Sequence, residues 1–305
     1  MQKIILYYKF VPIDDTETVM YWQRALCEQY GLKGRILISK HGINGTLGGD
    51  IKNLKYYTRA MKAHSLFDRI TYKWSDGRVE DFPKLSVKVR DEVVTFGVPG
   101  EIKVGLKGIV GGGKHLKPEA VHRLVAERGD EVVFLDGRNA YEAAICKFKN
   151  AVVPGARTTK DFIKELEKPA MQKLKNRPIV TYCTGGIRCE ILSTLMTKRG
   201  FSEVYQIDGG IAKYGEVYKD DGFWEGKLYV FDKRMQVAFS ENSKDIGSCI
   251  ICKSKTSNYE NCANKACNDL VLLCSKCVGK GVVTCSTSCA QIVATAAQPA
   301  SVQLN

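Results

Sequence analysis

Ile179-Val-Thr-Tyr-Cys183-Thr-Gly-Gly-Ile-Arg188-Cys189 is the stretch that decides the fold. A short apolar run leads to a cysteine in a loop with two glycines and an arginine, and residues 190–199 behind it have helical apolar spacing. A strand, a tight loop and a helix in this order turn backbone N–H groups towards one point, which stabilises an anion. The predicted anion is the thiolate of Cys183, or a group carried on its sulfur, because the same geometry lowers a cysteine pKa.

Cys183 is the predicted catalytic nucleophile of this loop, and Arg188 closes the loop and stabilises negative charge there. The residues between them are Thr184, Gly185, Gly186 and Ile187. The C-x4-R spacing is one residue shorter than the C-x5-R loop with which dual-specificity phosphatases surround a phosphate, so it suits a substituent on sulfur better than a phosphoryl group. Cys189 has two interpretations, a resolving thiol for Cys183 or a residue of the helix–sheet core, and we slightly favour the core.

Residues 116–235 around the loop alternate between strand and helix patterns with short connections. They predict a parallel sheet with helices on both faces, and a site at the C-terminal strand ends, where Cys183 lies. Arg138 and Glu142 have i,i+4 spacing and are expected to form a structural ion pair, and Asp136 is expected to cap the following helix. The expected elements are a helix over residues 118–127, a strand over 131–136, a helix starting at 137–142, a helix over 161–174, a strand over 178–182, a helix over 190–198 and a strand over 204–207.

Residues 1–98 form a second predicted domain. Its expected order β-α-β-α-β-β resembles a ferredoxin-like α+β sandwich of two layers. His41, Asn44 and Thr46 belong to a glycine-containing turn that could contact RNA, although a role in forming the turn is at least as well supported. The expected elements are a strand over residues 3–11, a helix over 16–30, a strand over 34–39, a turn over 41–46, a helix over 50–64, a strand over 70–73 and a strand or strand pair over 85–89 and 93–96. Residues 99–115 are rich in glycine and are the expected linker.

The overall composition bounds the class of protein. The chain has 305 residues, a net charge of +13 and a hydrophobic content of 44%, which suits a globular protein of two domains and a small module. The basic excess fits a polyanion such as RNA as well as it fits a solubilising surface. No signal peptide is recognisable, and no segment approaches the roughly 20 apolar residues of a membrane span. We therefore expect a cytoplasmic protein without a membrane partner, and the sequence indicates no oligomeric state.

Eight of the twelve cysteines lie between residues 249 and 289. Two C-x2-C pairs, one C-x4-C pair and one C-x3-C pair match two tetrahedral zinc sites of four thiolates each. Disulfides are disfavoured because they need an oxidising compartment, and which pairs share a metal stays open. The expected ligands are Cys249, Cys252, Cys262, Cys267, Cys274, Cys277, Cys285 and Cys289. They define a module over residues 245–290, and the small, polar tail over 291–305 is expected to be disordered.

Several segments of residues 116–235 resemble the rhodanese family. They are Phe134-Leu-Asp-Gly-Arg-Asn-Ala-Tyr-Glu142, Val153-Pro-Gly-Ala-Arg157, Cys183-Thr-Gly-Gly-Ile-Arg188 and Asp208-Gly-Gly-Ile211. One departure is visible, because Cys146-Lys-Phe-Lys149 stands where the family usually has Gly-His before the proline-glycine turn. The resemblance implies a rhodanese-like α/β domain in which Cys183 is a reactive thiolate or carries a persulfide.

The whole chain resembles, more closely still, the rhodanese-domain tRNA uridine hydroxylases. The segments that carry this likeness are Gly34-Arg-Ile-Leu37, Gly42-Ile-Asn-Gly-Thr46, Cys183-Thr-Gly-Gly-Ile-Arg-Cys-Glu190, Trp224-Glu-Gly-Lys227 and Val230-Phe-Asp232. In that family a ferredoxin-like domain precedes the rhodanese domain and a cysteine-rich tail. The resemblance implies a tRNA partner and oxygen-dependent hydroxylation of the wobble uridine to 5-hydroxyuridine, with O2 as co-substrate and Cys183 as the essential thiolate.

Two other functions stay open at this point. A sulfurtransferase would hold a persulfide on Cys183 and pass its sulfur to an acceptor. An RNA-binding adaptor would keep the loop only as a vestige, which the intact Cys183 and Arg188 disfavour. The sequence shows no facial triad of two histidines and a carboxylate for iron and no G-x-G-x-x-G fingerprint, so no organic cofactor is identifiable, and the source of the electrons stays open.

Overall fold

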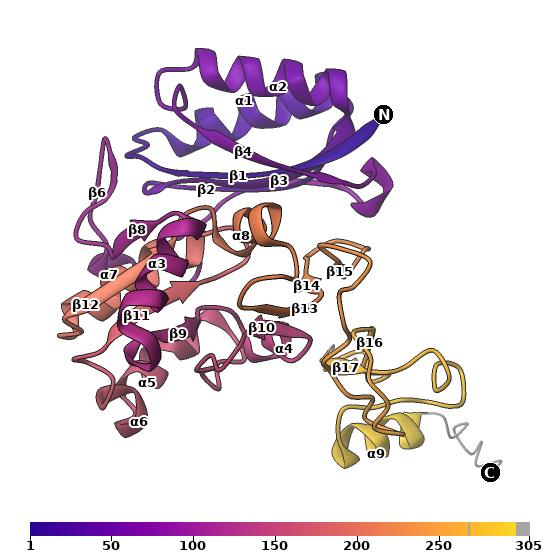
Figure 1. Ribbon diagram of the computed structural model, residues 1–305. Helices are drawn as coiled ribbons and strands as arrows, with labels where there is room; N and C mark the ends of the chain where they lie inside the picture. The colour runs from indigo at the N-terminus through magenta and orange to yellow at the C-terminus, as the bar shows by residue number, and fades with distance from the viewer. Residues whose placement is uncertain (268, 297–305) are drawn as a thin grey trace, which may run out of the picture.

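Three units follow one another in the computed structural model, which describes residues 1–267 and 269–296 (Figure 1). The N-terminal sheet and its helices lie against a central α/β domain, and a small cysteine-rich module lies on the far side of that domain. The multidomain α/β architecture expected from the sequence is confirmed. Within the two described ranges, no helix combines the length and the apolar character that crossing a membrane requires.

The N-terminal domain is a five-stranded sheet with helices α1 and α2 on one face (Figure 1). The strand order is β4-β1-β3-β2-β5, in which β2 and β5 are parallel and the other neighbours are antiparallel. The chain order β-α-β-β-α-β with an added edge strand is that of a ferredoxin-like sandwich. The elements are β1 Gln2–Phe10, α1 Thr16–Gln29, β2 Lys33–Ser39, β3 Gly42–Asp50, α2 Ile51–Ala63, β4 Thr71–Asp76 and β5 Leu85–Val89.

The predicted turn over residues 41–46 is wrong, because strand β3 begins at Gly42. Its glycines serve close approach within the sheet. A Cβ on Gly42, whose φ is +143°, would lie 2.1 Å from the backbone oxygen of Lys9, and one on Gly45 would lie 2.3 Å from the Tyr7 ring. Glycine inside a strand marks such approaches as well as turns. The predicted order β-α-β-α-β-β is therefore wrong, and residues 93–96, expected as a strand, form none.

Side chains alternate along β1 between the two faces of the N-terminal sheet. Ile5 and Tyr7 are fully buried in the core beneath the helices, where Tyr7 lies against Tyr57 of α2. Leu6 and Tyr8 therefore point to the opposite face, which lies towards the central domain (Figure 1). The central domain covers the part of this face around Leu6 and Tyr8, whereas Arg35 of β2 and Lys88 of β5 on the same face are exposed.

The central domain is a parallel sheet with helices on both faces, as expected, and its strand order is β8-β12-β11-β9. Helices α5, α6 and α7 pack on one face through Phe162, Met171 and Leu192. Helices α3 and α8 pack on the other face through Val121 and Tyr214. The elements are β8 Lys114–Leu116, α3 Pro118–Arg128, β9 Val133–Asp136, α4 Ala140–Ala143, β10 Cys146–Phe148, α5 Phe162–Glu167, α6 Pro169–Gln172, β11 Pro178–Tyr182, α7 Ile187–Lys198, β12 Glu203–Ile207, α8 Gly210–Tyr218 and β13 Trp224–Gly226, which pairs with β10.

Some elements of this region differ from the expectation. Pro169 divides the expected helix over residues 161–174 into α5 and α6, because proline lacks an N–H and forces the preceding residue out of the helical region. Helix α7 begins at Ile187, so Arg188 and Cys189 lie in its first turn. The expected linker over residues 99–115 contains a small hairpin and the start of β8. The hairpin strands are β6 Val104–Gly105 and β7 Gly108–Ile109, and the short 3-10 helices are η1 Val79–Asp81, η2 Pro99–Glu101, η3 Gly129–Glu131 and η4 Thr159–Asp161.

The C-terminal region is built from two short strand pairs and a helix. Strands β14 Leu228–Tyr229 and β15 Gln236–Val237 are antiparallel, as are β16 Tyr259–Asn261 and β17 Leu270–Leu272. Tyr259 joins the core of the central domain, and its hydroxyl donates a hydrogen bond to the backbone oxygen of Tyr141. Of the tail expected to be disordered over residues 291–305, residues 291–296 lie in helix α9 Thr287–Ala296, and residues 297–305 lie outside the described residues.

Candidate active site

Cys183 directly follows β11, an interior strand of the central sheet, and is fully buried. The loop turns into α7 at Gly186, whose φ of +99° is a conformation that glycine adopts at little cost. The Gly186 N–H donates a hydrogen bond of 3.2 Å to the Cys183 sulfur. The sequence predicted this inward-pointing amide at the helix N-terminus, and the structure places it there.

The surroundings of Cys183 favour its thiolate. Burial alone would raise the pKa of the thiol, but a hydrogen bond from the Cys189 thiol, the charge of Arg188 and the backbone N–H groups of Cys189 and Arg188 outweigh it. Together they lower the pKa of Cys183 from 9.0 to about 6. At neutral pH the sulfur is therefore mostly ionised, which is the nucleophilic form.

Arg188 makes a buried, bidentate ion pair with Glu142 of α4. The two N–O distances are 2.5 Å and 2.8 Å, and Arg188 Nη2 also donates to Thr184 Oγ1 at 3.2 Å. Side-chain exposure is 9% for Arg188 and 0% for Glu142, so water contributes little to holding either charge. The predicted pair of Arg138 and Glu142 is wrong, because Glu142 reaches the loop arginine instead.

Arg138 pairs with Asp136, which ends β9. The guanidinium donates to both carboxylate oxygens at 2.9 Å and 2.6 Å, and both side chains are fully buried. Arg138 Nη2 also donates to the backbone oxygen of Cys146 at 2.6 Å, which ties β9 to β10. Asp136 was expected to cap the next helix, but the cap of α4 is Asn139, whose N–H donates to Glu142.

The N-terminal domain closes over the loop. A Cβ on Gly185 would lie 2.7 Å from the Leu6 side chain, and one on Gly186 would lie 2.9 Å from the Tyr8 hydroxyl. Leu6 and Tyr8 are the β1 residues on the face opposite the helices, so the N-terminal sheet itself packs against the loop. The active loop therefore lies at a domain boundary, which no pattern in the sequence indicated.

A polar cluster connects the two domains beside the loop. Tyr8 Oη donates to Glu190 Oε1 at 3.2 Å, and Glu190 Oε2 accepts from Gln206 at 3.2 Å and lies 3.3 Å from His115 Nε2. Hydrogen bonds to Asp208 and to Glu190 raise the pKa of His115 to about 10, so this histidine is cationic at neutral pH. Sequence reasoning missed these residues because they come from separate strands and one helix start.

Lys73 of β4 brings a second cation to the loop. Its ammonium lies 5.1 Å from the centroid of the Tyr8 ring. Burial lowers the pKa of Lys73, while the negative charges of Cys183 and Asp208 oppose that shift. The N-terminal domain therefore places an amine close enough to the reactive sulfur for the two to interact electrostatically.

Phe231 is an exposed aromatic ring next to the loop. Its exposed fraction is 61%, the Arg188 guanidinium carbon lies 5.8 Å from its centroid, and the Tyr229 ring packs edge-on at 5.1 Å. Three residues on, Arg234 donates to Ser75 of β4 at 3.3 Å, which ties this segment to the N-terminal domain. An exposed ring beside the loop arginine offers a surface on which a flat ligand can stack.

The predicted RNA-contact residues lie on or beside β3. His41 is in the turn that precedes the strand, and Asn44 and Thr46 lie opposite Tyr8 and Leu6 of β1. Asn44 Nδ2 donates to the backbone oxygen of residue 93 at 3.1 Å, which is a structural role. A contact of these three residues with RNA stays a prediction.

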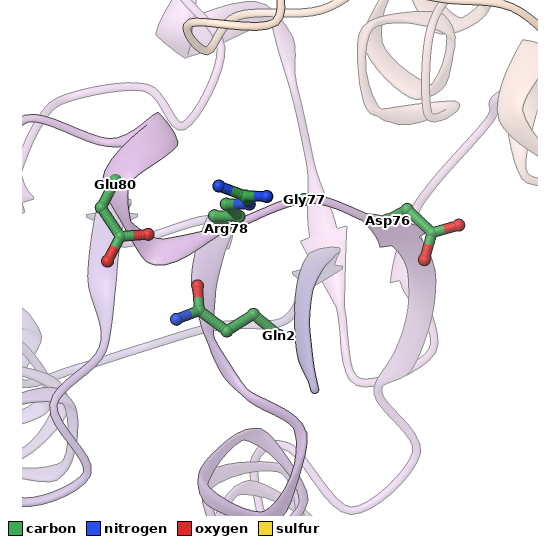
Figure 2. Close-up of a pocket in the computed structure, with 5 residues that line it drawn as sticks. All are labelled: Gln2, Asp76, Gly77, Arg78 and Glu80. Carbon is green, nitrogen blue, oxygen red and sulfur yellow. The ribbon is translucent and has the colours of Figure 1, made fainter.

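A separate hollow lies on the edge of the N-terminal domain (Figure 2). It is lined by Gln2, Asp76, Gly77, Arg78 and Glu80. These residues include no nucleophile, and the Gln2 side chain is already used to accept from the backbone N–H of residue 79 at 2.7 Å. We therefore assign the candidate site by chemistry, at Cys183.

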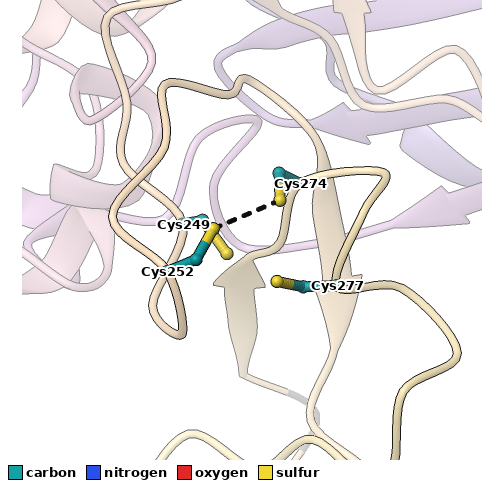
Figure 3. Close-up of side chains that lie close together, drawn as sticks. All are labelled: Cys249, Cys252, Cys274 and Cys277. Carbon is teal, nitrogen blue, oxygen red and sulfur yellow. Dashed lines mark hydrogen bonds between the residues drawn. The ribbon is translucent and has the colours of Figure 1, made fainter.

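The eight C-terminal cysteines gather into two groups of four whose sulfurs lie within 4.8 Å of one another. Each group combines two cysteine pairs that are separated in sequence by a pair of the other group. The sequence alone had left open which pairs come together. Sulfur–sulfur distances include 3.5 Å for Cys252–Cys274, drawn in Figure 3, and 3.6 Å for Cys285–Cys289. A tetrahedral zinc site with bonds of about 2.3 Å has sulfurs about 3.8 Å apart, so both groups fit this ion. The groups are Cys249, Cys252, Cys274 and Cys277, and Cys262, Cys267, Cys285 and Cys289.

Known families cover most of the chain. Family profiles match residues 2–93 (UPF0176 acylphosphatase like domain), 118–216 (Rhodanese-like domain) and 225–290 (Rhodanase C-terminal). A tRNA uridine(34) hydroxylase of Arthrobacter sp. (strain FB24) is 58% identical over 95% of this chain and 99% of its own length. Another, of Corynebacterium diphtheriae, is 60% identical over 90% of each chain. A solved rhodanese-like domain from Anabaena sp. is 20% identical, with a TM-score of 0.31, over 37% of this chain and 78% of its own.

Proposed function

The chain belongs to the family of the tRNA uridine(34) hydroxylases and is therefore an enzyme that hydroxylates the wobble uridine of tRNA, and we propose that Cys183 is the thiolate on which this reaction depends. Dioxygen is the proposed co-substrate and 5-hydroxyuridine the proposed product. The observation that carries the role of Cys183 is the position of its sulfur at the end of an interior strand, where it accepts from the Gly186 amide and the charge of Arg188 helps to lower its pKa.

The chemistry of uracil suits a thiolate partner. The C4 carbonyl of the base is conjugated with its C5–C6 double bond, so a thiolate can add at C6 and move an electron pair onto C5 and O4. We propose that Cys183 forms this S–C6 bond and that C5 then meets dioxygen. Lys73 is the proposed cation that stabilises the negative charge, because it already acts on the sulfur in the free enzyme.

Recognition of tRNA is proposed to involve both domains. A uridine lifted out of the anticodon stack could rest on the exposed ring of Phe231, because protein aromatic rings commonly stack single-stranded bases. His41, Asn44 and Thr46 are further proposed RNA contacts, and Asn44 and Thr46 would make them at the domain boundary. Because tRNA is the substrate, the cytoplasm is the proposed place of action.

The two cysteine groups are proposed to bind one zinc ion each, as structural sites with four thiolates. The β16–β17 hairpin lies between them, since Cys262 directly follows β16 and Cys274 comes soon after β17. Tyr259 of this hairpin is anchored to Tyr141, the neighbour of Glu142. Zinc would thus stiffen a module that supports the helix from which Glu142 holds the loop arginine.

The decisive experiment treats unmodified tRNA with the pure protein, dioxygen and a thiol reductant, followed by nucleoside mass spectrometry. We expect 5-hydroxyuridine at position 34, carrying one atom of heavy oxygen when labelled dioxygen is used. Cys183→Ser should reduce product by roughly 10³-fold or more, as loss of a nucleophile does in other enzymes. Cys27→Ala, in the N-terminal core, is the control and should stay active. Full activity of Cys183→Ser would refute the proposed role.

A persulfide carrier is the second candidate, because the rhodanese-like match includes the loop and the Gly186 amide could equally stabilise a persulfide. Incubation with thiosulfate followed by intact-protein mass spectrometry tests it. A gain of one sulfur that disappears in Cys183→Ser would support this activity, and an unchanged mass would exclude it.

A further inference from the structure

A second buried thiol lies beside the loop that holds the reactive sulfur. Cys189 lies in the first turn of α7 and is fully buried, and its thiol is one of the groups that lower the pKa of Cys183. Gly186 connects the two residues, because its N–H donates to the Cys183 sulfur at 3.2 Å. Its N–H donates to the backbone oxygen of Gly186 at 3.0 Å, which fixes it beneath the loop. On the other side, the sulfur would lie 3.3 Å from a Cβ placed on Gly137. Cys189 therefore belongs to the core and also lies beside Cys183, so the two interpretations of the sequence are not exclusive.

The position of this pair differs from that of every other cysteine in the chain. Eight cysteines form the two groups of four in the C-terminal module. Cys27 lies in the N-terminal core, and Cys146 accepts from Arg138 at 3.1 Å. Cys183 and Cys189 are thus the two thiols that meet at the reactive loop, with Arg188 between them in sequence.

Hydroxylation by dioxygen needs electrons from a donor. When one oxygen atom enters the C5–H bond of uracil, the second atom must be reduced to water by two electrons and two protons. Two thiols that join as a disulfide release two electrons and two protons. The sum balances: uracil C5–H, O2 and two thiols give C5–OH, water and one disulfide.

We infer that Cys183 and Cys189 form a dithiol that supplies these two electrons and closes as a disulfide in each turnover. The inference rests on the proposed function of Cys183. The C5–H, O–O and Cys189 S–H bonds break, while the C5–O bond, the S–S bond and the O–H bonds of the alcohol and water form. Cys183 enters as the thiolate, so the second proton comes from solvent, and the S–C6 bond that it forms with uracil breaks again before the two sulfurs join. A small external thiol then reduces the disulfide by exchange, and the attacking thiol ends as its own disulfide.

Single-turnover chemistry tests this inference. The full-length protein is reduced, freed of reductant without air, and mixed with excess unmodified tRNA and dioxygen. We expect at most one 5-hydroxyuridine per chain, together with a disulfide between Cys183 and Cys189. Trypsin cleaves after Arg188, so this disulfide would link the peptides of residues 176–188 and 189–198, which mass spectrometry detects directly. Added thiol should restore repeated turnover.

Cys189→Ser separates the redox role from a positioning role. The serine hydroxyl can still donate to the Cys183 thiolate, but it cannot form a disulfide. We expect its single-turnover product to fall at least tenfold, with no linked peptides, and an unchanged thermal unfolding temperature would show that the fold is intact. Cys189→Ala can neither donate a hydrogen bond to Cys183 nor form a disulfide. Its single-turnover product should be no greater than that of the serine variant.

The outcomes separate this inference from the proposed function. Wild-type product amplitude in Cys189→Ser, or several products per chain without reductant, would overturn the dithiol while leaving the hydroxylase role of Cys183 intact. Wild-type activity in Cys183→Ser would overturn both. Product and linked peptides that rise together in the wild type and vanish in Cys189→Ser would establish the dithiol.

Discussion

The loop at Cys183 and the cysteine-rich module use the same side chain in opposite ways. In the loop, two thiols meet, and backbone amides with an arginine hold one of them as a thiolate. In the module, four sulfurs converge twice. A sulfur with one sulfur neighbour and a cation is reactive, whereas four sulfurs around one point suit a metal that makes them inert. The number and charge of the neighbours, not the cysteine itself, set the chemistry.

The largest expected effect comes from breaking the module. Cys274→Ser removes one ligand of the first group, and we expect at least one of two zinc ions per chain to be lost. Structural zinc contributes about 10 kcal/mol or more to the folding of small modules, so the β16–β17 hairpin should lose its amide protection in hydrogen exchange. The matched variant Cys183→Ser should keep both ions and the protection. Full zinc content in Cys274→Ser would contradict the assignment.

The next effect comes from the charge pair behind the loop. Glu142→Gln leaves the Arg188 guanidinium buried without its anion, which should cost about 3–5 kcal/mol of unfolding free energy. Urea unfolding measures the change. Glu131→Gln breaks the exposed pair with Arg128 and should have a much smaller effect, because solvent screens both charges. Equal losses of unfolding free energy in the two variants would show that the buried pair stabilises the fold no more than the exposed pair does.

The pH dependence of activity tests whether the loop holds Cys183 as a thiolate. Because the pKa of Cys183 is lowered to about 6, its thiolate predominates at pH 7 and is lost as the pH falls through 6. We expect kcat/KM to decrease about tenfold for each pH unit below 6. Ultraviolet difference absorbance between the wild type and Cys183→Ser follows the same thiolate, because the thiolates of the module cancel. A midpoint near 9 would show that the loop does not stabilise the anion.

The smallest effect concerns the ring beside the loop. Phe231→Ala removes the proposed stacking surface, and loss of about 1 kcal/mol should raise KM for tRNA roughly fivefold with little change in kcat. The exposed ring contributes little to folding, so the unfolding temperature should stay the same. Phe231→Tyr should retain KM, and Leu106→Ala, an exposed residue of the β6–β7 hairpin, is the control. An unchanged KM would exclude stacking at this position.

The sequence predicted the parts of the site that are close together along the chain. Cys183, Arg188 and the glycines between them form one turn, and short cysteine spacings report a metal group directly. The ion-pair partner of Arg188 could not be predicted from neighbouring residues, because Glu142 lies 46 residues away in sequence. Glu142 also has Arg138 as a plausible partner only four residues away. Likewise, strand β3 was missed because its glycines meet neighbouring strands, and that contact exists only after the sheet has formed.

Contributions from another domain were beyond sequence reasoning for a similar reason. Tyr8 and Lys73 lie on ordinary strands, and only the docking of the two domains brings them to the loop. The interleaving of the cysteine groups also depends on the β16–β17 hairpin. This hairpin reverses the chain and brings Cys274 and Cys277 back to Cys249 and Cys252. Local chemistry was therefore predictable, whereas its partners depended on tertiary structure.

The packing of Leu6 and Tyr8 on the loop has a consequence for the survival of the enzyme in air. A thiolate at neutral pH is readily oxidised by peroxides, first to a sulfenic acid and then irreversibly to sulfinic and sulfonic acids. Cys183 has no exposed surface, because the N-terminal sheet lies over the glycines beside it. Burial beneath the N-terminal sheet thus limits the access of peroxides to this sulfur in the free enzyme.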